Sequence, residues 1–297
     1  MFATLLGALP RPPLPEGAST EALLEVVVRA QEAAGLDPIT DGGLLASEDP
    51  VAAWRATTAL TDRAVKAVLL GPYSRDAREA TLATVATADA LNRVVRDLVD
   101  AGCPLVEIHE PAATRIGSDP DERARFRDLH LRLLDGVTGT HLSLAITGGD
   151  AKAAGVDTLL AAPYASLAVD LIAGPDNWNL VVRTPGDRGV ICGALSAEAD
   201  TDDGPEMIVW AAGYATSTGG RGPDRVGIAT ASSLAHLPWD VAVAKMTRLG
   251  EALQIATASP DERRAALDPR AIDSRSAALG RYEPGPSHPP RRDDDPT

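Results

Sequence analysis

The residues of this chain best suited to chemistry stand where short apolar segments end. The segment 101–111 alternates apolar and other residues and then stops on His109 and Glu110, just before a proline. The alternation predicts a buried strand, and in parallel α/β barrels the carboxyl ends of the strands carry the site. His141 and Asp170 accompany two later apolar segments. An imidazole or a carboxylate in such a place binds a substrate, moves a proton or ligates a metal.

Two histidines and one carboxylate form a common ligand set for a divalent transition metal. His109, His141 and Asp170 would supply that set if their strands end at one mouth, and they are the predicted metal site. The alternative is that these side chains bind no metal and only hydrogen-bond to polar neighbours in a hydrated funnel. Together with Glu110 they are also the predicted catalytic residues, although support of its own loop is an equal alternative for Glu110. For His236, in an apolar stretch, a structural bond to backbone is favoured over ligation.

Cysteine and aromatic candidates are fewer. Cys192 closes a strand-like segment and would line the same mouth, yet a lone cysteine in an apolar strand is more often an inert core residue. Cys103 is expected to pack. Two cysteines do not make a disulfide framework or a Cys-x-x-Cys metal site, so a reducing cytoplasm is the expected location. Tyr73 is expected either as a lid over the mouth or as a cap on the barrel rim.

The elements that must position these residues alternate in type. Eight short strand-like segments, bounded by Gly, Pro or Asp, are separated by longer segments with helical periodicity. Strands are expected at 3–7, 37–41, 64–71, 105–109, 140–146, 166–172, 189–195 and 225–231, and the main helices at 20–34, 75–101, 121–134 and 241–256. This alternation predicts an α/β fold with a single closed (β/α)8 barrel over residues 1–257, with a doubly wound sheet as the alternative.

Composition limits the partners. The 297 residues are 44% hydrophobic and carry a net charge of -14, which repels phosphate backbones and anionic lipid, so we expect neither nucleic acid nor membrane binding. Glycine-rich nucleotide fingerprints are absent, and the first 15 residues resemble neither a signal peptide nor a membrane helix.

Residues 258–280 are expected as a short helical extension and 281–297 as a disordered Pro-, Arg- and Asp-rich tail. The expected partners are a small-molecule substrate and a second copy or homologous subunit.

Five short motifs follow one another along the chain: Leu6–Arg11, Gln31–Asp37 with Thr40–Gly42, Leu70–Pro72, Ala101–Pro111 and Ser232–Pro238. In order and spacing they resemble motifs of the cobalamin-independent methionine synthases and their single-barrel relatives. The resemblance runs from about residue 3 to residue 255. It implies a barrel whose mouth holds a zinc ion that activates a thiol, with a His-x-Cys pair, a glutamate and a second cysteine as ligands.

Matched residue by residue, the implied zinc ligands are largely replaced. His141 keeps the histidine, whereas Ser143 and Ser232 stand where the two cysteines are expected and Asp170 stands for the glutamate. A neutral serine hydroxyl does not replace a thiolate as a zinc ligand. We therefore expect no thiolate-rich zinc site, and a divalent transition metal is left open only on the His109, His141 and Asp170 set.

The amino-acid pocket implied by the resemblance has changed as well. Ala8 stands for a serine, Gly43 for a glutamate and His109 for an aspartate that binds the amino group. We therefore expect a repurposed enzyme, performing group transfer or lyase chemistry on a small polar metabolite with thiol or amino-acid character, and no methionine synthase activity. The alternative is a catalytically silent barrel that binds a ligand or serves as a subunit beside an active homologue. The expected substrate-binding residues are Ala8, Asp41, Tyr73, Ser143, Cys192 and Ser232.

Overall fold

A computed structural model describes residues 1–46, 48–78, 85–201 and 204–267 of the chain. Contacts divide the chain into two units, residues 1–257 and residues 258–297. In the second unit, helix α10 (Pro260–Ala266) begins with a capping box, in which the side chains of Ser259 and Glu262 each accept a hydrogen bond from the other's backbone N–H. The predicted disordered tail over 281–297 lies outside the described residues.

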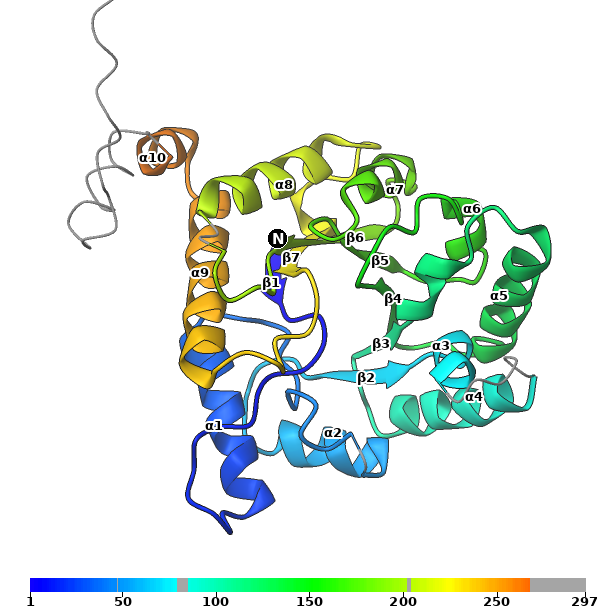
Figure 1. The fold of residues 1–297 in the computed structure, drawn as a ribbon, viewed down its shortest axis with the longest axis horizontal. Helices are drawn as coiled ribbons and strands as arrows, with labels where there is room; N and C mark the ends of the chain where they lie inside the picture. The colour runs from blue at the N-terminus through cyan, green and yellow to red at the C-terminus, as the bar shows by residue number, and fades with distance from the viewer. Residues whose placement is uncertain (47, 79–84, 202–203, 268–297) are drawn as a thin grey trace, which may run out of the picture. The chain divides into compact units, whose positions relative to one another are not determined.

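Seven parallel strands form one curled sheet in the first unit (Figure 1), in the order β1-β7-β6-β5-β4-β3-β2. Their bounds are β1 Phe2–Thr4, β2 Lys66–Leu70, β3 Leu105–His109, β4 His141–Ile146, β5 Ser166–Asp170, β6 Gly189–Leu195 and β7 Val226–Thr230. Parallel neighbours need crossover connections, and helices supply most of them and pack on the outside of the sheet. The α/β class predicted from the alternation is therefore confirmed.

The helices of the first unit are α1 Thr20–Ala33, α2 Pro50–Thr58, α3 Pro72–Arg78, α4 Val85–Asp100, α5 Pro120–Leu133, α6 Val156–Leu159, α7 Trp178–Arg183, α8 Pro205–Ser217 and α9 Trp239–Thr257. The single helix predicted over 75–101 is replaced by α3 and α4, and residues 79–84 between them lie outside the described residues. Helices α2 and α8 are not among the main helices expected from the sequence. Both start with a proline in the first helical turn, which is a typical helix start. Their amphipathic periodicity is weak, so the rest of each helix is hard to predict. No helix in the described ranges is both long and apolar enough to cross a bilayer.

The strand predicted over 37–41 does not form a ladder. Asp37 makes one bridge to Ala3, and Ile39 makes one bridge to Val65. Pro38, between them, has no N–H to donate, and its carbonyl accepts a hydrogen bond from the Thr4 hydroxyl at 2.8 Å. The segment thus lies between β1 and β2 with minimal pairing, and the sheet has seven ladder strands where the sequence predicts eight.

The interior of the curled sheet is filled by small and branched side chains. Leu6, Ala145, Ala168, Ile191 and Ala229 form one buried cluster, against which Phe2 packs. Since side chains alternate along a strand, every second residue shares this inward direction. His109 is paired with Ala145 in the register, and Asp170 follows Ala168 by two residues, so both are directed inward.

Candidate functional site

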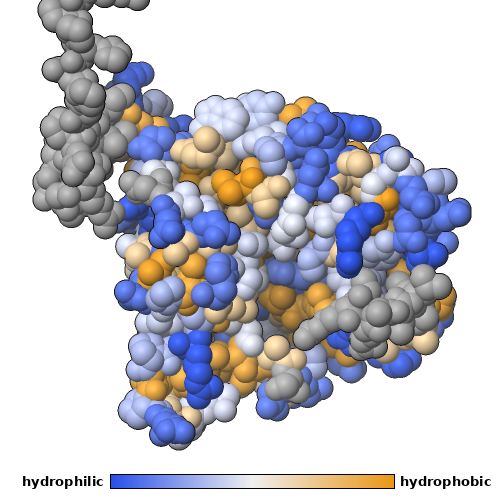
Figure 2. Space-filling model, viewed as in Figure 1, coloured by the Kyte–Doolittle hydropathy of each residue, from blue (hydrophilic) through white to orange (hydrophobic). Residues whose placement is uncertain are grey.

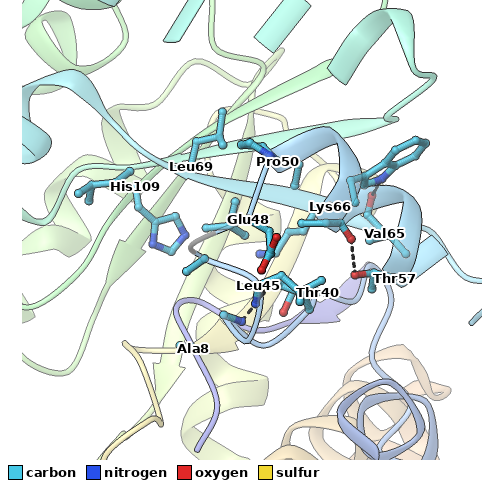
Figure 3. A pocket seen from close by; sticks show the side chains of 18 of the residues that line it. Ala8, Thr40, Leu45, Glu48, Pro50, Thr57, Val65, Lys66, Leu69 and His109 are labelled. Carbon is cyan, nitrogen blue, oxygen red and sulfur yellow. Dashed lines mark hydrogen bonds between the residues drawn. The ribbon is translucent and has the colours of Figure 1, made fainter. Parts of the chain in front are cut away.

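A cavity of about 650 Å³ opens beside β2, at the carboxyl side of the sheet (Figure 3). Its walls come from β2, from the loops that follow β1 and the 37–41 segment, and from α2. His109, at the end of β3, projects into it, and Lys66 forms part of its floor. Figure 2 shows apolar side chains in the hollow over β2. This cavity contains the imidazole that the sequence singles out.

Three ionisable side chains form a hydrogen-bonded chain from the sheet interior to the cavity. The Lys66 ammonium donates to both carboxylate oxygens of Glu107, at 2.8 and 2.9 Å, and to the carbonyl of Leu5 at 2.6 Å. His109 Nε2 lies 2.6 Å from Glu107 Oε1. The side chains of Lys66 and Glu107 are 1% and 0% exposed, while that of His109 is 11% exposed. The imidazole is therefore the most accessible of these three side chains.

Burial and charge act in opposite directions on the buried pair. Burial raises the pKa of Glu107, but the charge of Lys66 and the hydrogen bonds from His109 and Lys66 outweigh it and hold that pKa at about 2. Burial lowers the pKa of Lys66 from its ordinary value, and the Glu107 carboxylate opposes this shift. Glu107 is thus ionised at neutral pH, which makes it an acceptor only.

An ionised Glu107 fixes the tautomer of the neutral His109 ring. Since the carboxylate can only accept, Nε2 must carry the proton, and Nδ1 then has a lone pair. Within the described part of the chain, Nδ1 has no hydrogen-bond partner. The arrangement suits a general base, and Glu107 would stabilise the imidazolium formed when Nδ1 takes a proton.

Two of the predicted substrate-binding residues line the cavity, Ala8 and Asp41. The Asp41 carboxylate accepts hydrogen bonds at 3.0 Å from the N–H groups of Gly43 and Leu45, so it shapes its own turn. Gly43 also lines the cavity, with φ +77°, and a Cβ on it would lie 2.7 Å from the Cβ of Ala8. The backbone conformation here suits glycine and leaves no room for the glutamate that the resemblance places at this position.

His141 does not belong to this site. It is the first residue of β4, at the amino end of the strand, where it pairs with Leu105, and it is exposed. Its Nε2 lies 2.9 Å from the hydroxyl of Ser166, the first residue of β5. His109 and Asp170 are the last residues of their strands. The direction of β4 therefore separates His141 from both, and its predicted catalytic and metal-binding roles find no support in this geometry.

Asp170 is buried and its carboxylate is occupied. Oδ1 accepts from the N–H groups of Ile172 and Ala173 at 2.9 and 2.8 Å, and Oδ2 accepts from that of Gly148 at 3.0 Å. These bonds hold the two loops that follow β4 and β5. Across the described ranges, no three His, Cys, Asp or Glu side chains are grouped closely enough to hold a metal. The residues present therefore fit neither the predicted metal set nor the zinc site that the resemblance implies.

Glu110 is a structural anchor, which was the alternative raised for it. Its buried carboxylate accepts from the N–H groups of Tyr73 and Ser74 at 3.0 and 2.7 Å, at the start of α3. Oε1 also lies 3.1 Å from His130 Nε2, and the other ring nitrogen of His130 lies 2.6 Å from the hydroxyl of Tyr164. Burial and the Glu110 charge raise the pKa of Tyr164 well above its ordinary value. Glu110 thus fastens α3 to α5 beneath the mouth and does not line the cavity.

The remaining predicted residues also lie away from the cavity lining. Tyr73 caps the rim, with its hydroxyl bonded to Glu122 and its ring edge-on to Phe126. Cys192 is buried with its sulfur directed to the carbonyl of Ala211 in α8, and burial raises its pKa to about 12, which excludes a reactive thiolate.

Ser143 and Ser232 make no contact that marks them as ligand-binding residues. The Ser143 hydroxyl is buried inside the sheet without a hydrogen-bond partner among the described residues. Ser232 is half-buried and follows β7. Its neighbour Ser233 holds the loop after β1 in place, with its hydroxyl 3.2 Å from both the N–H and the carbonyl of Ala8.

Sequence reasoning missed Lys66 and Glu107, although a signal was available. Each is a charged residue inside an apolar strand segment, and their charges are opposite. Fully buried Lys and Glu are rare unless paired. Two such residues on strands expected to be neighbours therefore predict an internal ion pair.

Comparisons with known proteins agree with the motifs. No family model matches the chain. It is 29% identical over 272 residues to a 5-methyltetrahydropteroyltriglutamate–homocysteine methyltransferase of Rhodopseudomonas palustris, a match that covers 81% of this chain and 33% of that protein. A homologue of the same description from Parvibaculum lavamentivorans is 28% identical over 185 residues. The chain thus spans about a third of the length of these relatives.

Solved structures give the same assignment of fold. A B12-independent methionine synthase from Shewanella superposes with a TM-score of 0.70 at 16% identity, covering 89% of this chain and 99% of that one. A methyltransferase from Methanosarcina mazei superposes with a TM-score of 0.54 at 13% identity, covering 84% and 94%. The recognition based on the sequence motifs is confirmed: the chain is similar in sequence to methyltransferases of this description and shares its fold with a B12-independent methionine synthase.

Proposed function

We propose that this chain is a repurposed enzyme that binds a small metabolite in the cavity beside β2 and uses His109 to move a proton, in a group-transfer or lyase reaction. The observation that carries the proposal is the Lys66–Glu107–His109 chain, which ends on an imidazole nitrogen in the cavity. We also propose that residues 37–41 take the place of the eighth strand of a closed barrel, since they bridge Ala3 in β1 and Val65, the residue just before β2.

The three residues have distinct roles in this proposal. His109 accepts a proton from the metabolite at Nδ1 and returns it to the product or leaving group. Glu107 holds the ring by Nε2 and balances the charge of the imidazolium. Lys66 keeps Glu107 ionised in the interior. An ionised carboxylate behind a histidine orients the ring and stabilises its charged form in many hydrolases, which is the physical precedent for the arrangement.

We do not propose that this chain catalyses the methyl transfer named in the descriptions of the similar proteins. It would need a metal-activated thiol, and the residues found at the sites that the resemblance indicates do not form a metal ligand set. The positions of the parent's amino-acid pocket are Ala8, Gly43 and His109 here, and none of them offers a carboxylate to a substrate ammonium.

A second candidate is a catalytically silent barrel that acts as a partner subunit. The observation that favours it is an aromatic cluster on α7 and α8, in which Trp178 lies edge-on to Trp210 and Tyr214 with ring centroids 4.9 and 5.4 Å apart. Trp210 is 54% exposed and Tyr214 is 38% exposed. Large exposed aromatic residues are typical of surfaces that another chain covers.

The discriminating experiment is untargeted metabolite profiling with purified protein. A mixture of small metabolites that includes thiols and amino acids is incubated with the wild type, with His109→Gln and with His236→Gln, the last being an exposed histidine outside the cavity. We expect one or more metabolites to be consumed by the wild type and by His236→Gln but not by His109→Gln. Consumption that persists in His109→Gln contradicts the role of His109, and no consumption by any of the three proteins favours the silent subunit.

A further inference from the structure

Strand β2 has a free edge, meaning the side of residues 66–70 that faces away from β3. It lies at one end of the sheet (Figure 1), and among the described residues its only ladder partner is β3. On the other side Ile39 makes a single bridge: its N–H donates to the carbonyl of Ala64 at 2.9 Å, and its carbonyl accepts from the N–H of Lys66 at 3.0 Å. The chain then turns at Gly42, where φ is +65°. Beyond this bridge the edge of β2 has no neighbouring strand.

The backbone groups on this edge lack partners. In a strand the N–H and C=O of one residue point to the same side, and the side alternates from residue to residue. Since the N–H of Lys66 points away from β3, those of Val68 and Leu70 do so as well, whereas Gly71 donates to the carbonyl of His109 in β3 at 2.8 Å. Within the part of the chain that the structure describes, the C=O of Lys66 and the N–H and C=O groups of Val68 and Leu70 make no hydrogen bond.

The cavity follows this free edge. It is lined by every residue from 65 to 70. Since successive side chains of a strand point to opposite faces, a cavity that touches all of them lies along the edge and reaches both faces. Val68, on the inward face, is 36% exposed, whereas Ala67 and Leu69 on the outward face are 8% and 6% exposed. The unpaired backbone groups therefore border a space of about 650 Å³, a size that suits a small-molecule ligand.

Unpaired groups of this kind bind an amide. An exposed strand edge accepts an extended segment whose own N–H and C=O groups continue the ladder. An extended residue placed beyond Ile39 would repeat the two bonds that Ile39 makes: its N–H would donate to the C=O of Lys66, and its C=O would accept from the N–H of Val68. Paired residues of neighbouring strands project their side chains to the same face, so the side chain of this residue would accompany that of Ala67, on the outward face.

The outward side of the cavity suits an apolar side chain. Its walls include Ala53 and Trp54 of α2 and Leu69 of β2. The indole nitrogen of Trp54 already donates to the carbonyl of Val65 at 3.0 Å, and the Thr57 hydroxyl donates to the carbonyl of Ala53 at 2.9 Å. Since these polar side-chain atoms are paired, an apolar group gains most from entering the space between β2 and α2.

From these contacts we infer that the ligand of the cavity contains a secondary amide in an extended segment, as in an acylated amino acid or a short peptide, and pairs with the free edge of β2 as an added strand. The side chain of the paired residue lies between β2 and α2, and the next group along the ligand lies on the inward face, toward His109. The inference rests on the proposed function only in taking this cavity as the ligand site. It requires no charge on the ligand.

Three uncharged probes test the inference by ligand-observed NMR: N-acetyl-leucine N-methylamide, its analogue in which an ester oxygen replaces the leucine N–H, and N-acetyl-glycine N-methylamide. We expect the leucine amide to bind. The ester should bind about tenfold more weakly, because the carbonyl of Lys66 loses its donor while the shape of the probe is kept. The glycine amide should also bind more weakly, because it leaves the space between β2 and α2 unfilled.

Amide hydrogen exchange of the protein measures the edge directly. In the free protein the N–H groups of Val68 and Leu70 should exchange faster than those of Ala67 and Leu69, which point to β3. At about ten times its Kd the leucine amide should slow exchange at Val68 roughly tenfold, since only the free fraction then exchanges. Exchange at Ala67 should not depend on the probe in this way.

A matched pair of variants tests the donor. Val68→Pro removes an N–H that points to the free edge and therefore breaks no ladder bond, a position where strands tolerate proline. Val68→Ala also removes the branched side chain but keeps the N–H. We expect Val68→Pro to bind the leucine amide about tenfold more weakly than Val68→Ala does. If Val68→Pro does not fold, as judged by circular dichroism, the ester comparison and the exchange rates of the wild type decide the outcome.

Three results would overturn the inference: slow exchange at Val68 and Leu70 in the free protein, equal binding of the amide and the ester, or no binding of any probe. The first would mean that the chain itself covers the edge. Because binding and exchange are measured without any reaction, their outcome is independent of the metabolite experiment. Turnover that depends on His109 without binding of the leucine amide would reject the ligand class and keep the proposed function. Binding of the amide along β2 without any turnover would do the reverse.

Discussion

Replacement of Lys66 by methionine should destabilise the protein strongly, because it leaves the Glu107 carboxylate buried without its cation. The shift of the Glu107 pKa from its ordinary value of 4.5 to about 2 corresponds to about 3 kcal/mol of stability, taking ~1.4 kcal/mol per pKa unit. Removal of one partner from a buried ion pair costs about 3–5 kcal/mol in other proteins. We therefore expect Lys66→Met to lose about 3–5 kcal/mol at pH 7.

The dependence on pH distinguishes this mechanism from simple loss of packing. In the wild type the pKa of Glu107 is lowered, so its contribution to stability is present above pH 4.5 and is lost as the pH falls toward 2. In Lys66→Met, burial acts on the carboxyl without the opposing lysine, so its pKa rises above the ordinary value. The stability lost in the variant should therefore shrink as the pH falls from 7 to 4.

The assay is urea unfolding of four proteins between pH 4 and 7: the wild type, Lys66→Met, Glu107→Gln and the double variant. Lys152→Met is the control, because Lys152 forms only an exposed ion pair with Asp176 and should change stability by less than about 1 kcal/mol. The double variant should be more stable than the sum of the two single losses predicts. Equal losses in Lys66→Met and Lys152→Met, or additive losses in the double variant, would refute the reasoning.

Three further predictions follow from contacts around the site. Gly71→Ala should lower the melting temperature markedly, because a Cβ there would lie 2.1 Å from Glu110 Oε1; an unchanged melting temperature would show that the Glu110 anchor can move. Cys192 should resist iodoacetamide at pH 8 in the folded protein and react only in urea, since its pKa is raised to about 12; labelling of the native protein, detected by mass spectrometry, would contradict this. Asp170→Ala should cost about 2–4 kcal/mol in urea unfolding, because three backbone N–H groups of the loops after β4 and β5 lose their buried carboxylate acceptor; a loss below about 1 kcal/mol would mean that water replaces the carboxylate.

Much of the fold could be predicted because its signals are local. The apolar segments that become β2 to β7 are short, and turn residues bound them, so their positions follow from neighbouring residues alone. The extent of helix α8 could not be predicted because the helix is apolar on most sides and its periodicity is weak, so only its start, at Pro205, is marked in the sequence. The 37–41 segment has the composition of a strand, but Pro38 removes a donor.

A site residue could be predicted from the sequence only where its position at the end of a strand was sufficient to place its side chain in the cavity. His109 and Glu110 follow one another, yet only His109 faces the cavity, since alternate residues of a strand point in opposite directions. The prediction for His141 fails because strand direction was not taken into account. Motif matching assigns it to the mouth, whereas its place as the first residue of β4 puts it at the other end of the sheet.

The sequence by itself determined the α/β class and the similarity to methionine synthases, because these depend on residue identity and local spacing. Only the tertiary structure decided what surrounds His109. The register between β2 and β3 brings Lys66 to Glu107 across 41 positions of sequence. Residues 37–41 form only single bridges, to Ala3 and to Val65, and the cavity lies along β2 beyond that pairing. Charge pairing and cavity shape depend on which strands become neighbours and where their pairing stops, and that information is spread over the whole sheet.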